Sequence, residues 1–286
     1  MSALAIILGL TVAGLYGASD FAGGVATKRV PAIWVLVVSQ TVGLGLGLLA
    51  VGLDPNADPT TGALVRGAVA GVAGVVGLWL LYTALAGGTM GVVAPVTGVT
   101  SALVPVGWGL TQGERPGAVA LIGVVLALGA VALAAAPASA PAPSDRSGPR
   151  AATGIPLALA AGLCFGTILV LLSDVQPRDG MWPLVAWRCA SVPLAFAALL
   201  IARPRPRPGP PTVALASVAG LVEVLANGVY ILAAREGLLS LVGVLGSLYP
   251  ISTVLLARVV LRERLGRVQQ LGLALALGGI ALIAAG

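Results

Sequence analysis

Histidine is absent from this 286-residue chain, and charged residues make up only 9% of it. The absence of histidine removes the commonest metal ligand, the commonest general base and the usual switch near neutral pH. The two cysteines, Cys164 and Cys189, lie in apolar runs without metal-ligand spacing, so we expect no metal site and no cofactor. Any proton transfer would have to use a carboxylate.

Apolar residues dominate the remainder of the chain. The residues A, V, I, L, M, F, W, Y and C account for 58% of it, a proportion that a water-facing surface of this size does not tolerate. Spanning a hydrocarbon core of ~30 Å takes roughly 20 apolar residues per helix, so about ten spans fit, with short loops and no large soluble domain. We expect an all-α integral membrane protein that crosses the cell (cytoplasmic) membrane many times.

The net charge of +6 comes from 16 Lys and Arg against 10 Asp and Glu. The basic residues lie in loops between apolar runs and form no single basic face, so we expect no nucleic acid partner. Lys and Arg are retained on the cytoplasmic side of a membrane. With ten spans, the loops after spans 1, 5, 7 and 9 hold eleven basic residues and the opposite face holds four. This bias predicts that both termini lie outside the cell.

Ten apolar runs, separated by charged or Pro/Gly-rich breaks, are the expected transmembrane helices. They lie at about 3–26, 32–53, 63–86, 89–111, 117–136, 153–173, 182–202, 212–234, 239–261 and 267–285. The longest break, from Pro137 to Thr153, is rich in Pro, Ala and Ser, which is typical of a flexible linker.

The sequence repeats itself at a single offset of 149 residues. Residues 113–135 align without a gap with residues 262–284, and the charged residues Glu114 and Glu263 coincide in that alignment. Low-complexity sequence can produce spurious matches, but the charged pairs and the preserved register argue against that explanation.

We therefore divide the chain into a first five-helix repeat at 1–136, a linker at 137–152 and a second five-helix repeat at 153–286. Because five spans is an odd number, the two copies have opposite orientations in the membrane. This inverted arrangement allows a site at the midplane to be exposed to each side in turn.

Residues 94–116 and 244–265 carry a family resemblance, since each holds a Glu-Arg pair and is followed by a Gly-spaced helix. The family resemblance is also carried by Tyr16-Gly17, Phe165-Gly166 and Arg188. Over almost its whole length the sequence resembles the drug/metabolite transporter superfamily, specifically proteins with two EamA-type domains. The resemblance implies a ten-helix secondary transporter with a central cavity, but no particular substrate. In many members of this superfamily the topology is the reverse of the one predicted here, with both termini in the cytoplasm.

Glu223 is the clearest functional candidate, because a charge at the centre of a span costs ~2.5–3.5 kcal/mol on insertion scales and usually marks a pathway. Asn227 at i+4 and Tyr230 at i+7 share its helix face. We expect all three to bind substrate, and Glu223 to exchange protons with the cavity. The alternative is a structural role, in which Glu223 pairs with Arg188 or is held by Ser and Thr hydroxyls of neighbouring helices, and the two interpretations can coexist.

Arg188 lies one or two turns into the seventh span, where its planar donor fork suits a carboxylate or phosphate of the substrate. Alternatively, it extends to the interface without binding a ligand. Gln40 occupies roughly the same place in the first half. Asp20, near the end of the first span, is a second proton-coupling candidate, although interfacial water or Lys28 would also satisfy it.

Uncharged polar residues complete the expected substrate site. The candidates for the cavity wall are Tyr16, Gln40, Tyr82, Thr97, Thr100, Ser101, Ser247 and Tyr249. Ser and Thr commonly bond to their own helix backbone, so about half of the set is expected to miss the cavity. Tyr16 and Tyr82 are the preferred candidates.

Two further features concern the mechanics of the bundle. Pro95 and Pro105 in the fourth span and Pro250 in the ninth can kink their helices, which makes these helices candidates for moving gates. Glu114 and Glu263 lie at span-ending turns, so we assign them to the turn and the membrane boundary rather than to the substrate.

These features predict a secondary active transporter, not an enzyme, which moves a small polar or amphipathic metabolite by alternating access. Proton coupling through Glu223 is an additional hypothesis, and export is favoured by family analogy alone. No Walker-type loop is present, which argues against direct use of ATP. Two alternatives stay open, an intramembrane enzyme acting on a lipid-linked substrate and a non-transporting membrane scaffold. We expect a monomer or a homodimer.

Overall fold

A computed structural model describes residues 2–87, 90–134, 149–260 and 266–285, and these residues are helical apart from short connections. The α-helices are, in chain order, α1 (Ala3–Thr27), α2 (Ala32–Gly52), α3 (Thr61–Gly87), α4 (Met90–Thr111), α5 (Ala118–Ala134), α6 (Pro149–Ser173), α7 (Trp182–Ala202), α8 (Pro210–Glu236), α9 (Leu239–Gly246), α10 (Tyr249–Val260) and α11 (Arg267–Ala285). A 3₁₀ turn, η1 (Pro177–Asp179), lies between α6 and α7.

Six of the described helices are long and apolar enough to cross a membrane, namely α1, α2, α3, α6, α7 and α8. Shorter apolar stretches occur in α4, in α5, across α9 and α10, and in α11. The expectation of an all-helical protein with many membrane spans is therefore confirmed. The linker predicted at 137–152 falls largely outside the described residues.

The ninth expected span consists of two helices in line. Helix α9 ends at Gly246, and α10 begins at Tyr249 after Ser247 and Leu248. Pro250 lies in the first turn of α10, where a missing backbone N–H is tolerated. Helix α4, by contrast, continues through Pro105 without a break. Among the spans that the structure describes, the ninth alone is thus interrupted near its middle.

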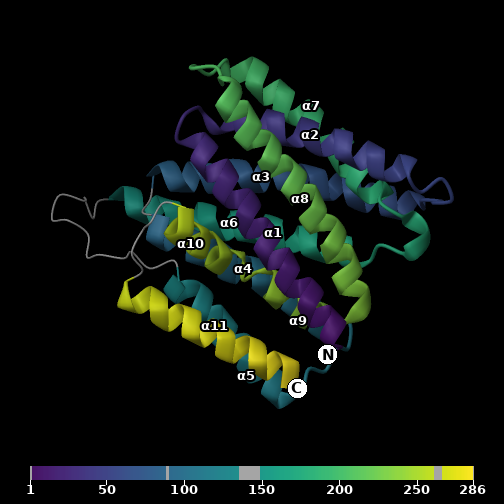
Figure 1. The fold of residues 1–286 in the computed structure, drawn as a ribbon, viewed down its shortest axis with the longest axis vertical. Helices are drawn as coiled ribbons and strands as arrows, with labels where there is room; N and C mark the ends of the chain where they lie inside the picture. The colour runs from purple at the N-terminus through teal and green to yellow at the C-terminus, as the bar shows by residue number, and fades with distance from the viewer. Residues whose placement is uncertain (1, 88–89, 135–148, 261–265, 286) are drawn as a thin grey trace.

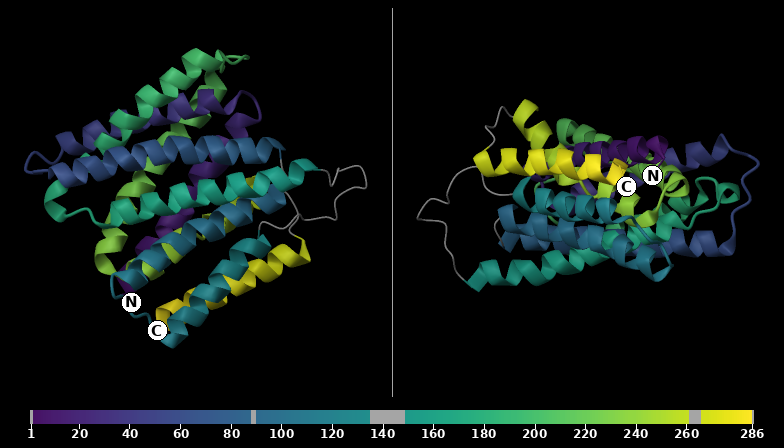
Figure 2. Two further views of the ribbon diagram at one scale, coloured as in Figure 1. Left: turned by 180° about the vertical axis from the view of Figure 1, so that it is seen from behind. Right: turned by 90° about the horizontal axis from the view of Figure 1, so that it is seen from below.

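The helices form two layers that meet at both edges (Figures 1 and 2). Helix α1 packs between α8 and the α9–α10 pair in one layer, and α6 packs between α3 and α4 in the other. Helices α2 and α7 join the layers at one edge, while α5 and α11 pack together at the other. Both termini lie at the same end of the bundle, which we call the terminal end; the opposite end is the linker end.

Two glycines allow the close approach of helices across this arrangement. A Cβ atom on Gly17 of α1 would lie 2.8 Å from the carbonyl oxygen of Tyr249, and one on Gly166 of α6 would lie 2.7 Å from that of Ser101. Each glycine follows an aromatic residue, Tyr16 or Phe165. The small residue therefore places the neighbouring ring beside α10 or α4.

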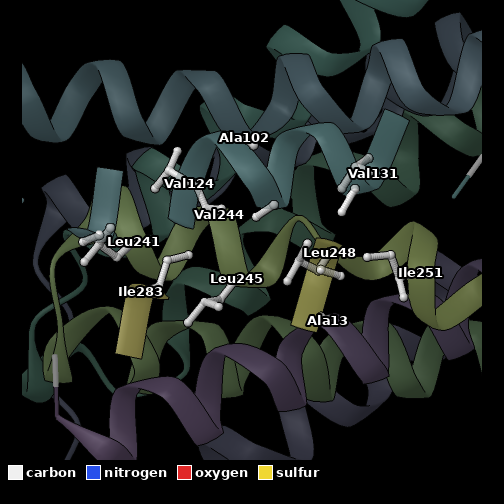
Figure 3. Close-up of a cluster of buried hydrophobic side chains, with 14 residues drawn as sticks. Ala13, Ala102, Val124, Val131, Leu241, Val244, Leu245, Leu248, Ile251 and Ile283 are labelled. Atoms are coloured by element: carbon white, nitrogen blue, oxygen red, sulfur yellow. The ribbon is translucent and has the colours of Figure 1, made fainter. Parts of the chain in front are cut away.

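Two large apolar clusters stabilise the bundle. The first joins α5 and α11 to α9, α10 and α4 through Val124, Val131, Leu241, Leu245, Leu248, Ile251 and Ile283, among others (Figure 3). The second, which we call the terminal cluster, includes Val12, Leu172, Leu184, Tyr230 and Val242. Its members come mainly from the halves of α1, α6, α7, α8 and α9 nearer the termini, so the interior is packed at the terminal end.

Candidate functional site

A partly open cavity of about 1000 Å³, including the space at its mouth, lies between the two layers. Its polar lining residues are Tyr16, Ser19, Asp20, Ser39, Ser101, Glu223, Asn227, Ser247 and Tyr249. Asp20, Gly23 and Val35 belong to the linker-end halves of α1 and α2. Because the terminal cluster fills the other end, the cavity extends from the middle of the bundle toward the linker end.

The carboxylate of Glu223 lies in the cavity wall and is paired with Arg188. Arg188 Nη2 is 3.3 Å from Glu223 Oε1, and Arg188 Nη1 donates to Glu223 Oε2 at 3.5 Å. Gln40 Nε2 also donates to Glu223 Oε2, at 3.4 Å. Both oxygens of the carboxylate are therefore engaged by groups behind the cavity wall.

Arg188 is almost completely enclosed, with 1% of its side chain exposed against 19% for Glu223. Its Nη1 also donates to Gln40 Oε1, which accepts a second hydrogen bond from Ser191 Oγ at 2.7 Å. A buried guanidinium is tolerated only where acceptors replace its hydration. Gln40 and Glu223 supply acceptors for Nη1 from α2 and α8, and Glu223 supplies the counter-charge, so the network joins three helices; Nε and Nη2 make no hydrogen bond among the described residues.

Tyr16, Asn227 and Tyr249 form the second polar group of the wall. Tyr16 Oη donates to Asn227 Oδ1 at 2.5 Å, and the rings of Tyr16 and Tyr249 meet edge to face with centroids 6.4 Å apart. The Nδ2 of Asn227 is buried and has no hydrogen-bond partner among the described residues. One donor of a buried amide is therefore left for a ligand or water inside the cavity.

Asp20 lies one helical turn from Tyr16 and, unlike Glu223, is exposed to the cavity. Its carboxylate has no hydrogen bond or ion pair within the described part of the chain, and Lys28 does not reach it. Asp20 and Glu223 are the charged groups among the described lining residues. The wall thus presents one neutralised carboxylate and one free carboxylate.

Comparison with known families decides what kind of protein carries this cavity, since the model of the EamA-like transporter family matches residues 152–285. The second half of the chain belongs to the EamA-like transporter family. The predicted resemblance is confirmed for this EamA-like half, and the chain is a multi-span membrane transporter with a small-molecule substrate.

The fold of the whole chain also has a known counterpart. One solved crystal structure, described only as that of a protein, is 19% identical, with a TM-score of 0.80 over 99% of this chain and 96% of its own. At this identity the likeness concerns the fold alone. No curated protein sequence matches the chain.

The structure brings seven of the predicted site residues together in the cavity wall: Tyr16, Asp20, Ser101, Glu223, Asn227, Ser247 and Tyr249. Arg188 and Gln40 lie directly behind the wall. Tyr230, in the EamA-like half, is fully buried in the terminal cluster because it lies one turn closer to the packed end. The hydroxyl of Thr97 donates to the carbonyl of Ala158. Tyr82 belongs to α3, but its side chain lies outside the described residues.

Other lining residues were missed in the sequence, although some had a signal. Phe165, at the start of the EamA-like half, lies in the wall as Tyr16 does; the 149-residue offset pairs these two rings. Ser191 does not line the cavity but donates to Gln40 behind the wall; it stands at i+3 from Arg188 and therefore on its helix face. No sequence pattern indicated that Trp187 lines the cavity, because a tryptophan in an apolar run is equally compatible with a position facing lipid.

Glu114, assigned from sequence to a turn, makes an unexpected contact with the EamA-like half. Its Oε1 accepts the backbone N–H of Leu239 at 2.7 Å, and its Oε2 accepts that of Ser240 at 2.9 Å. No side chain of α9 caps its own N-terminus. A carboxylate of the first half therefore supplies the cap for a helix of the second. Glu263 lies outside the described residues.

Proposed function

We propose that this protein is a secondary active transporter in which two inverted five-helix repeats, 1–136 and 153–286, alternately expose the central cavity to either side of the cytoplasmic membrane. The substrate is a small polar or amphipathic metabolite, and export is the favoured direction. The observation that carries the proposal is a cavity near the middle of the bundle that is packed shut at the terminal end. A transporter that is open to one side of the membrane and closed to the other has this arrangement.

The packing of the helices supports the inverted repeat. The packing of α1 against α8 has its counterpart in α6 against α3, and that of α4 against α6 in α9–α10 against α1. The pairs α2 with α7 and α5 with α11 join corresponding helices of the two halves. Gly17 and Gly166, which correspond at the 149-residue offset, make the same kind of backbone approach. A twofold axis in the membrane plane would produce each of these relations.

The interrupted ninth span supports a site at this level of the membrane. Gly246, Ser247 and Tyr249, on both sides of the break, line the cavity. In secondary transporters, broken helices place backbone polar groups next to the substrate where protein shields them from lipid.

Proton coupling is assigned to Glu223, with Asp20 as the second carboxylate that faces the cavity. Protonation of Glu223 would leave Arg188 without its counter-charge, which is costly inside a protein. A change in protonation at Glu223 therefore changes the energy of the network that joins α2, α7 and α8. In this way a proton can alter the balance between two arrangements of the bundle.

Flux through proteoliposomes tests this coupling. A set of labelled polar and amphipathic metabolites is offered to the reconstituted protein with and without a pH gradient. We expect gradient-driven movement in the wild type, its loss in Glu223→Gln, and its retention in Glu236→Gln, which alters an exposed carboxylate at the end of the same helix. A Glu223→Gln protein with unchanged gradient-driven flux would refute the coupling.

Alternating access is tested separately by cysteine labelling. Ser39 lines the cavity and Ser240 is 1% exposed at the terminal end. In proteins without Cys164 and Cys189, Ser39→Cys should react with a membrane-impermeant maleimide from the linker side, and Ser240→Cys should be protected. Conditions that drive turnover should lower the first reactivity and raise the second. Changes in the same direction at both positions would contradict alternation.

A further inference from the structure

The charges around the cavity do not balance. Its described lining residues carry two carboxylates, Asp20 and Glu223, and no Lys or Arg. One guanidinium, that of Arg188, neutralises Glu223 from behind the wall. Counted formally, two carboxylates and one guanidinium leave one carboxylate unbalanced, that of Asp20, which faces the cavity without a partner among the described residues.

Arg188 is unable to offer its charge to a substrate in this state. Its side chain is 1% exposed, Nη1 donates to Gln40 and Glu223, and Nη2 lies 3.3 Å from Glu223, while Nε and Nη2 make no hydrogen bond among the described residues. A substrate carboxylate would have to displace Glu223 to reach it, leaving an uncompensated carboxylate in the wall. The cavity therefore disfavours anions and gains nothing from the carboxylate of a zwitterion.

Aromatic side chains provide the remaining surface. Tyr16 and Tyr249 stand edge to face next to Asp20, and Phe165 and Trp187 line the cavity. Cations are attracted to the faces of aromatic rings, most strongly where water is excluded. Asn227, which is 0% exposed, keeps an unpartnered Nδ2 in the same wall. This N–H is suited to a neutral acceptor oxygen on the ligand.

We infer that the cavity binds an organic cation, that is, an ammonium group held by Asp20 and aromatic rings, attached to an apolar body with a neutral carbonyl or hydroxyl oxygen that accepts from Asn227. This inference rests on the proposed transport function and names the chemical class of its substrate. Asp20 supplies the counter-charge, Tyr16 and Tyr249 supply ring surfaces, and Arg188 holds Glu223 in place without contacting the ligand.

Three ligands of nearly the same shape test this inference by calorimetry on the purified full-length protein in detergent. N,N,N-trimethylphenylalaninamide is a permanent cation, N,N,N-trimethylphenylalanine is the zwitterion, and N-acetylphenylalaninamide is neutral. We expect the cation to bind about tenfold more tightly than the other two, a ratio equivalent to about 1.4 kcal/mol. Equal or tighter binding of the zwitterion would overturn the assignment.

Variants locate the charge that is responsible. Asp20→Asn should remove the preference for the cation over the neutral ligand, Asp20→Glu should keep it, and Asp54→Asn, in an exposed loop, should leave it unchanged. An Asp20→Asn protein that retained the full preference would refute the role of Asp20. Phenethyltrimethylammonium lacks the carbonyl, so Asn227→Leu should equalise the two cations; continued discrimination between them would refute the acceptor contact.

These outcomes are separable from those of the proposed function. If flux and opposite labelling changes occur but the cation shows no preference, the substrate class is wrong and transport by alternating access stands. If the cation binds as expected but the maleimide reactivities of Ser39→Cys and Ser240→Cys change in the same direction, the cavity is a cation site and the proposed alternation fails.

Discussion

Glu114 Oε2 accepts the backbone N–H of Ser240 at 2.9 Å, and so binds the first half of the chain to the start of helix α9 in the second. Gly113 makes this geometry accessible. At φ +89° it ends α4 in a left-handed conformation, with the N–H groups of Gly113 and Glu114 returning to the carbonyls of Leu110 and Gly109. The Gly-Glu sequence is thus a turn residue followed by a cap for another helix.

Replacement of Glu114 should loosen the terminal end. Glu114→Ala removes both acceptors from the α9 N-terminus, at a cost of about 1–3 kcal/mol for charge-assisted hydrogen bonds. We expect Ser240→Cys to react faster with maleimide in the Glu114→Ala background than with Glu114 present. Glu236→Gln serves as the control for loss of an acidic residue at the same end of the bundle. Unchanged protection of Ser240→Cys would show that the cap does not hold this end closed.

The Arg188 network predicts strong coupling between two variants. Arg188→Leu should destabilise the protein by about 3–5 kcal/mol, because it leaves Glu223 without its counter-charge. Adding Glu223→Gln should recover part of this loss, since the remaining polar group is neutral. Thermal unfolding in detergent of the wild type, both single variants and the double variant provides the cycle. Strictly additive losses would mean that the pair is not coupled.

Gln40 offers a milder test of the same network. Gln40→Leu removes the acceptor shared by Arg188 and Ser191 and should cost about 1–3 kcal/mol. Thr41→Val, which alters a neighbouring exposed residue whose hydroxyl bonds only to its own helix, is the matched control. A melting temperature for Gln40→Leu equal to that of Thr41→Val would argue against a structural role for Gln40.

The glycine contacts predict different effects for identical substitutions. Gly166→Ala should separate α6 from α4 and destabilise the protein by about 1–3 kcal/mol through overpacking. Gly14→Ala, on a helix face with open space around the new methyl group, should be neutral or slightly stabilising. The melting temperatures of the two variants measure the difference. Similar values would show that the α4–α6 crossing adjusts freely.

Asp179 makes stability depend on pH outside the membrane. Burial raises the pKa of Asp179, but hydrogen bonds from the amides of Thr60 and Gln176 and from the Thr60 hydroxyl outweigh it, so the pKa is lowered overall. With the folded-state pKa below the unfolded value of ~3.9, the carboxylate contributes stability above that value and loses it as pH falls through the folded pKa.

Asp179→Asn should therefore lower the melting temperature at pH 7, by an amount equivalent to about 1–3 kcal/mol. The difference from the wild type should shrink as the pH falls below ~3.9. Asp54→Asn, exposed in the preceding loop, should show neither effect. A difference that stayed constant down to low pH would mean that the charge of Asp179 is not its source.

Membrane orientation is predicted from the loop charges and the position of the termini. Both termini lie at the terminal end (Figure 1), and the basic loops predominate at the other. Reporters fused to the C-terminus should therefore be active outside the cytoplasm, and the linker end, with the cavity mouth, should face the cytoplasm. Cytoplasmic activity of a C-terminal reporter would reverse the assignment.

Sequence alone identified Glu223, Asn227 and Tyr16 as candidates because polar groups in a lipid environment are costly and therefore conspicuous. It failed to separate Glu223 from Tyr230, although both lie on one stripe of α8. The stripe runs along the helix, whereas the cavity ends partway down it. Only the packing of the terminal cluster determines that Asn227 lines the cavity and Tyr230 does not.

The all-helical fold, the approximate bounds of the apolar helices and their membrane setting were determined by the sequence, because each depends on local apolar length. The tertiary structure decided the partners of Arg188, the lack of a partner for the Asp20 carboxylate, and the contact between Glu114 and α9. Each of these depends on how helices far apart in the chain cross. Periodicity fixes the face of a helix, but the neighbour that the face meets is fixed only by the packing of the whole bundle.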